Sequence, residues 1–142
     1  MSLYRNILVA LDLSKDSELL IKKAHLIAER NEAKLNLLHV IEPISFAYGG
    51  EVPIDISTVQ KQLNDHAQTQ LDLLAEGTGY PIDKKLITTG GREGEIKNIA
   101  SELGADLVIV GSHDRHGLAL ILGSTVNGVI QGANCDVLAV KV

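Results

Sequence analysis

With 142 residues, the chain has the size of one domain, residues 1–142, and is long enough to bury a hydrophobic core. Hydrophobic residues make up 45% and charged residues 22%, which is typical of a folded globular protein and excludes a disordered one. The net charge of −5 argues against a nucleic-acid partner, because binding to a phosphate backbone requires a concentrated basic patch.

The sequence predicts neither a secreted nor a membrane protein. No apolar run approaches the length of a bilayer, and the first six residues lack the apolar core and cleavage site of a signal peptide. We therefore expect a cytoplasmic protein without membrane contact. Cys135 is the single cysteine, which excludes an internal disulfide, and we expect it to be a small buried side chain and not a nucleophile.

In its first half, the chain alternates short apolar runs with segments of helical periodicity. The run 7–11 is too short for a helix and predicts a strand buried on both faces. A helix is expected after Ser14 and ends near Asn31, and a second strand covers 35–41. Prolines and glycines in 42–55 predict a long surface loop, and apolar residues every three or four positions predict an amphipathic helix over 57–76.

The second half repeats this alternation. A weaker apolar run predicts a third strand over 85–89, and the helix that follows it is closed by Gly104. The remaining elements are strands at 107–110 and 137–140, with a helix from Ser124 to about Gln131 between them. The whole pattern is βαβαβαβαβ, which predicts a doubly wound, five-stranded parallel α/β sheet with helices on both faces.

The order of the strands decides where a ligand would bind. In the order 3-2-1-4-5, the first and fourth strands are neighbours at the point where the winding reverses, and ligands of such sheets bind beyond the carboxyl ends of the strands there. The loops that begin at Asp12 and Gly111 would then face each other across one crevice.

The stretch 111–125 has the composition of a phosphate-binding loop. It opens a strand into a helix and contains Gly111, Gly123, Ser124 and Thr125. Glycines let the backbone approach an anion closely, and the first N–H groups of a helix are free to bind it. His113 lies in the same stretch and is counted with these candidates.

Asp12 supports two interpretations. Its carboxylate can accept hydrogen bonds from a ribose or hold a metal ion beside phosphates. Alternatively, Asp12 and Ser14 cap the helix that follows, a role worth about 1 kcal/mol.

Taken together, these motifs resemble those of the universal stress protein family, over essentially the whole chain. The motifs that carry the resemblance are Tyr4–Ser14, Leu38–Val40, Ala105–His113, Gly123–Thr125 and Cys135–Val140. The resemblance implies an α/β sheet in the order given above and a cytoplasmic homodimer paired through the last strand, Val137–Val140. It also implies one of two subclasses, of which one binds ATP and the UspA-like one generally does not.

The ATP-binding subclass carries the signature G-x2-G-x9-G-[ST]. Carried over to this chain, the resemblance assigns the first and third glycines to Gly111 and Gly123 and the hydroxyl to Ser124. It likewise places Ala10 and Asp12 near the ribose and base, and assigns recognition of adenine to the backbone of Val40. ATP or AMP would be the ligand, with Mg²⁺ accompanying ATP.

Two departures from the signature weaken this expectation. Asp114 stands in place of the second glycine, and eight residues, not nine, separate it from Gly123. A carboxylate about 4 Å from a phosphate, at an effective dielectric constant near 20, opposes binding by about 4 kcal/mol, or about a thousandfold. Arg115 and His116 follow and can compensate this charge. We therefore predict weakened nucleotide binding, with AMP less affected than ATP; the alternative is a dimeric UspA-like protein that binds no nucleotide.

Metal binding and catalysis have less support. His113 and His116 lie three residues apart, but zinc requires three or four ligands and only Asp114 joins them. For His39, at a strand end, we expect a local hydrogen bond. No catalytic triad or pair of carboxylates is recognisable, which favours a binding protein over an enzyme. Slow ATP hydrolysis or autophosphorylation on Ser124 or Thr125 remains an open alternative.

Overall fold

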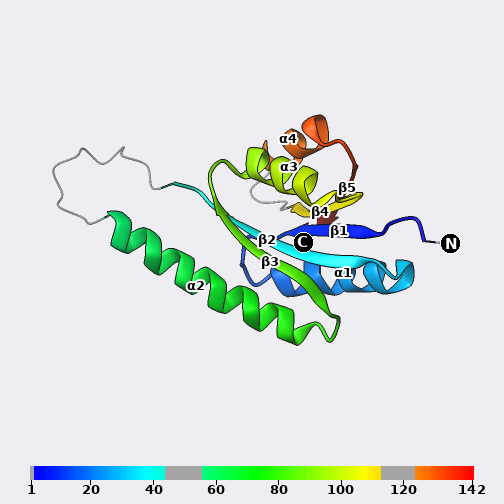
Figure 1. The fold of residues 1–142 in the computed structure, drawn as a ribbon, viewed down its shortest axis with the longest axis horizontal. Helices are drawn as coiled ribbons and strands as arrows, with labels where there is room; N and C mark the ends of the chain where they lie inside the picture. Colours follow the sequence, from blue (N-terminus) through cyan, green and yellow to red (C-terminus); the bar gives the residue numbers. More distant parts are fainter. Residues whose placement is uncertain (1, 44–55, 113–123) are drawn as a thin grey trace.

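The computed structural model describes residues 2–43, 56–112 and 124–142. Its five strands form one parallel sheet in the order β3-β2-β1-β4-β5 (Figure 1), as the alternation of elements predicts. The bounds of the strands are β1 Asn6–Ala10, β2 Lys34–Ile41, β3 Ile82–Thr89, β4 Leu107–Ser112 and β5 Asp136–Lys141.

Helices cover both faces of this sheet. Helices α1 (Ser17–Asn31) and α2 (Ile56–Gly77) lie on one face, and α3 (Arg92–Leu103) and α4 (Ser124–Gly132) lie on the other (Figure 1). Gly104 ends α3 in the left-handed conformation at φ 66°, as predicted. In the part of the chain that the structure describes, no helix has both the length and the apolar character needed to cross a bilayer.

The alternation of side chains along the inner strands divides the core into two layers. Alternate residues, such as Val9 and Leu37, pack under α1 and α2, where Leu71 of α2 is fully buried. The residues between them, such as Leu8 and Leu38, pack under α3 and α4. This arrangement leaves the carboxyl ends of β1, β2 and β4 at one edge of the molecule, with helices on both sides of them.

The prediction that the first strand is buried on both faces is confirmed for its middle residues, and the edge strands of the sheet differ from it. The middle of β1 and nearly all of β2 are buried, whereas β3 and β5 have one neighbouring strand each and expose about half of their residues. Exposure also explains why β3 begins at Ile82, three residues before the predicted start, because its first half, with Asp83 and Lys84, is polar. Residues 44–55 of the predicted surface loop lie outside the described residues.

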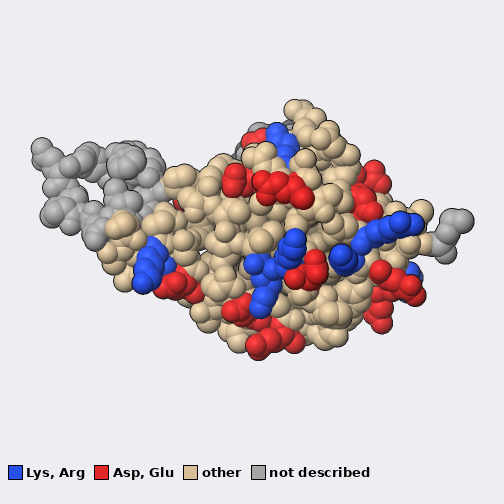
Figure 2. Space-filling view, in the orientation of Figure 1, with Lys and Arg blue, Asp and Glu red and all other residues tan. Residues whose placement is uncertain are grey.

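Charged side chains of both signs are interspersed on the face shown in Figure 2, where no continuous basic area is visible. Two of the described ion pairs are exposed, Lys85 with Asp72 at 2.8 Å and Arg92 with Glu42 at 3.0 Å. Exposed pairs of this kind contribute about 0–1 kcal/mol to stability. The surface in this view therefore offers little that would attract a polyanion.

Candidate functional site

The carboxyl ends of β1 and β4 lie side by side. Ala10 pairs with Val110 in the parallel register of the two strands, and Gly111 follows at once. A side chain at Gly111 would have little room, because a Cβ atom there would lie 3.3 Å from Cγ2 of Val142 and 3.6 Å from Cδ2 of Leu20. The carboxyl ends that sequence analysis expects to face each other therefore belong to neighbouring strands, although β4 continues through Gly111 to Ser112, two residues beyond the predicted end.

Asp12 organises the turn between β1 and α1. Its Oδ1 accepts hydrogen bonds from the backbone N–H of Ser14 at 2.9 Å and from the hydroxyl of Ser17 at 3.3 Å. The expected helix cap has a different form: Asp16 stands at the N-cap and makes no side-chain cap bond. Asp12 thus stabilises the turn that precedes the helix, since Ser17 is the first helical residue and is buried.

Leu13 turns the chain through an unusual backbone conformation. Its φ of 61° lies in the left-handed region, which costs a leucine about 1–2 kcal/mol. The side chain is partly buried against the core under α1, so packing helps to hold this conformation. The chain therefore turns sharply directly after β1, and β2 extends beyond the point where β1 ends.

Where β1 ends, the backbone of Val40 faces the space that β1 would have occupied. The carbonyl of Leu38 faces β1, since it accepts from the N–H of Leu11 at 2.8 Å, and the carbonyl of Ile41 faces β3, since it accepts from Gly90 at 3.0 Å. Backbone groups alternate sides along a strand, so both the N–H and the C=O of Val40 face the β1 side. Within the described residues, neither group bonds to the turn after β1.

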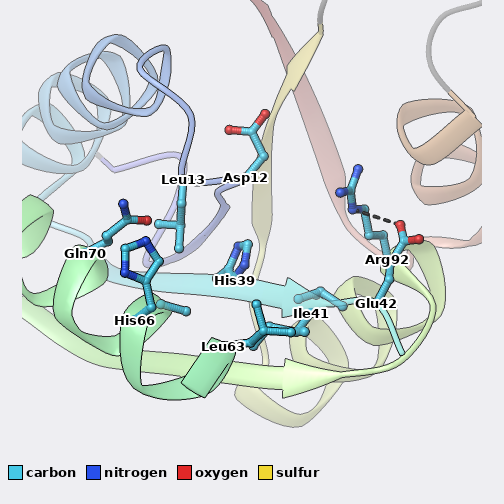
Figure 3. Close-up of a pocket in the computed structure, with 11 residues that line it drawn as sticks. Asp12, Leu13, His39, Ile41, Glu42, Leu63, His66, Gln70 and Arg92 are labelled. Atoms are coloured by element: carbon cyan, nitrogen blue, oxygen red, sulfur yellow. Dashed lines mark ion pairs between the residues drawn. The ribbon is translucent and has the colours of Figure 1, made fainter. Parts of the chain in front are cut away.

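A hollow of about 420 Å³ lies at this edge, between the turn after β1, the end of β2 and helix α2 (Figure 3). Its volume is within the range of about 300–1,000 Å³ that small-molecule sites occupy. The turn contributes Asp12 and Leu13, and β2 contributes His39 and Ile41. Apolar and polar side chains of α2 close the far side: Leu63, His66, Ala67 and Gln70.

His39 makes the local hydrogen bond that we expect from its position. Its Nδ1 lies 2.7 Å from the carbonyl oxygen of Leu11. This contact uses the acceptor that the N–H of Val40 would have used had the β1–β2 ladder continued. The side chain of His39 therefore ends the pairing of the two strands and lines the hollow at the same time.

An ion pair lies at the other side of the hollow. Arg92, the first residue of α3, contacts Glu42 through Nε at 3.0 Å, and both residues line the hollow (Figure 3). With Asp12, the hollow thus contains two carboxylates and one guanidinium group. This balance disfavours several phosphate charges inside the hollow itself.

His113, Asp114 and Gly123 lie outside the described residues, as do Arg115 and His116. Helix α4 begins at Ser124, as expected.

Cys135 directly precedes β5 and does not line the hollow. It is half-buried against the layer under α3 and α4 rather than fully buried. Burial raises the pKa of its thiol, and the charges of Asp136 and Asp106 raise it further. A raised thiol pKa disfavours the nucleophilic thiolate.

Comparisons with known proteins agree with this fold. The model of the universal stress protein family matches residues 3–141. The chain belongs to the universal stress protein family. Universal stress protein A homolog 2 of Coxiella burnetii is 38% identical to it over 98% of this chain and 96% of the relative.

Solved structures of universal stress proteins share the fold. UspA from Lactobacillus plantarum has a TM-score of 0.75 at 26% identity and covers 96% of this chain and 97% of its own. A universal stress protein in complex with cAMP has a TM-score of 0.62 at 24% identity, with 96% of each chain covered.

Sequence analysis placed Ala10, Asp12, Val40 and Gly111 at this edge but missed the part of the hollow that α2 forms. The apolar positions Leu63 and Ala67, four residues apart, fit the helical face that the periodicity indicates as the core side, whereas His66 is exposed. Whether that face covers the sheet fully or leaves a hollow at its end depends on how α2 is placed. No signal in the sequence specifies that placement.

Proposed function

We propose that this universal stress protein is a cytoplasmic regulatory protein that binds an adenine nucleotide, AMP or ATP, at the carboxyl ends of β1, β2 and β4. The observation that carries the proposal is the backbone of Val40, with an N–H and a C=O facing the side where β1 has ended. Adenine presents the complementary pair at one edge, an amine that donates and a ring nitrogen that accepts.

The neighbouring groups suit the rest of a nucleotide. Asp12 lines the hollow beside Val40 and carries acceptors for ribose hydroxyls. The phosphates would leave the hollow, with its two carboxylates, toward the end of β4 and the start of α4, where helix N–H groups favour an anion. ATP would bring Mg²⁺ with it, whereas AMP would not need it. The relative solved with cAMP supports an adenine nucleotide as the ligand class.

A pair of substitutions tests this site. Asp12→Ala removes the carboxylate, whereas Ser17→Ala removes the hydroxyl bonded to it and keeps the carboxylate. Losing a charged hydrogen-bond partner of the ligand costs about 1.5–3 kcal/mol, so we expect Asp12→Ala to weaken AMP binding about tenfold or more in calorimetry. Ser17→Ala should change the affinity by less than about threefold. Absence of measurable binding of both AMP and ATP to the wild-type protein would contradict the proposed function.

We also infer a homodimer paired through β5. This strand is at the edge of the sheet, and an uncovered edge strand with apolar side chains such as Leu138 promotes association. The N–H of Val142 donates to Ser112 of β4, so by alternation the N–H of Ala139 faces the open edge. Two copies joined there would cover both edges symmetrically.

The substitution Ala139→Pro tests pairing through the edge strand without disturbing the fold. Proline removes an N–H that makes no bond to β4 and is tolerated on edge strands. We expect the wild-type protein to sediment as a dimer and Ala139→Pro as a monomer with an unchanged circular dichroism spectrum. Ala139→Thr keeps the N–H and should remain dimeric. A monomeric wild-type protein, or a dimeric proline variant, would overturn the inferred pairing.

A further inference from the structure

The imidazole ring of His39 uses one nitrogen to hold the turn after β1, and its other nitrogen has no partner among residues 2–43, 56–112 and 124–142. Because the carbonyl oxygen of Leu11 can only accept a hydrogen bond, Nδ1 carries the hydrogen. In the neutral ring, Nε2 is then unprotonated and can accept one hydrogen bond. Among the described residues, no group donates to it.

This acceptor is open to the hollow. The fully buried polar side-chain atoms that lack a partner belong to other residues, so Nε2 of His39 is not sealed in the protein interior. The ring lines the hollow and lies between Leu13 and Ile41 in Figure 3, opposite Leu63 of α2. Leu63 is 41% exposed, so an apolar surface faces the hollow beside the free acceptor. A flat ring with a donor at its edge would match both features.

Adenine has such a donor. Its amine carries two hydrogens, and the backbone carbonyl of Val40, already assigned to this base, accepts one of them. The second hydrogen needs a further acceptor in the hollow. His39 is the residue next to Val40 and offers the missing acceptor.

We propose that His39 is a specificity-determining residue, which accepts a hydrogen bond from the amine of adenine through Nε2 and thereby selects 6-amino purines over 6-oxo purines. This inference rests on the proposed function. Inosine monophosphate would turn a carbonyl oxygen toward the lone pair of Nε2, and two acceptors that face each other remain unsatisfied. Since Val40 also favours the amine, the contribution of His39 is the change in the ratio of AMP to IMP affinity when His39 alone is replaced.

Two substitutions of His39 distinguish the role of Nδ1 from that of Nε2. Asparagine is short, so His39→Asn keeps an N–H group near Leu11 but places no acceptor at the position of Nε2. Glutamine is longer, so His39→Gln can place its amide oxygen there. For one hydrogen bond, we expect His39→Asn to weaken AMP binding about three- to tenfold in calorimetric titrations, and to leave IMP binding unchanged or stronger, since the facing acceptor is removed. His39→Gln should keep most of the wild-type ratio.

A histidine outside the hollow provides the control for His39. His25→Asn removes an imidazole that contacts the ring of Tyr80 at a tilt of 41°, outside the hollow, and should change neither affinity. Equal loss of AMP and IMP binding in His39→Asn, or no loss, would overturn the role of His39 while the proposed function stands. If the loss disappears with 2′-deoxy-AMP, a ribose hydroxyl is the donor and the amine assignment is wrong. A wild-type protein that binds neither nucleotide would overturn both proposals.

Discussion

Replacing Asp114 with glycine is expected to strengthen ATP binding by up to about a thousandfold. The substitution removes the repulsion between a carboxylate and a phosphate about 4 Å from it, which amounts to about 4 kcal/mol at an effective dielectric constant near 20. Asp114 stands at the second glycine of the family signature, where the phosphates of a nucleotide would pass. The gain should shrink as salt concentration rises, since screening weakens the repulsion. Calorimetric titration of ATP into the wild-type protein and Asp114→Gly measures it.

A second variant and a second nucleotide test whether the charge of Asp114 causes the gain in affinity. Asp114→Asn removes the charge and keeps the size of the side chain, so it should recover most of the gain. AMP carries less charge than ATP and should gain less from either substitution. If Asp114→Gly gains affinity and Asp114→Asn does not, the conformational freedom of glycine is responsible instead. If neither variant gains affinity, the electrostatic explanation is wrong.

Leu71→Ala is expected to lower the free energy of unfolding by about 2–5 kcal/mol, because it leaves a cavity in a close-packed layer. Leu71 is fully buried and holds α2 on the sheet. The same helix forms one wall of the hollow, through Leu63 and His66. The variant should therefore lose nucleotide affinity together with stability, as urea denaturation and calorimetry would measure.

Helix α2 offers a matched control two residues further on. Leu73 has the same side chain but is 63% exposed, so Leu73→Ala should change the free energy of unfolding by no more than about 0.5 kcal/mol. Similar losses in the two variants would mean that α2 does not pack as described. Loss of stability in Leu71→Ala without any loss of affinity would mean that α2 takes no part in the site.

The sequence predicts the order and type of the elements because each depends on local periodicity. Apolar runs such as Ile7–Val9 are too short for helices, and the glycine at 104 marks a helix end that the structure confirms at φ 66°. The placement of Asp12 and Gly111 at the carboxyl ends of inner strands was also predictable, although β4 continues through Gly111 to Ser112 and does not end at Val110 as predicted. The local pattern does not give the exposure of β3 and β5, because exposure depends on how many strands lie beside each of them.

The sequence by itself determined a parallel α/β sheet and the residues at the carboxyl ends of its inner strands, because periodicity and turn residues act over a few neighbouring positions. The tertiary structure alone decided which groups meet there. The bond from His39 to Leu11 joins residues 28 positions apart, and the wall of Leu63 and His66 depends on the packing of α2 against the sheet. Such contacts arise only when distant segments pack together, so no local pattern encodes the hollow or the position of His39 within it.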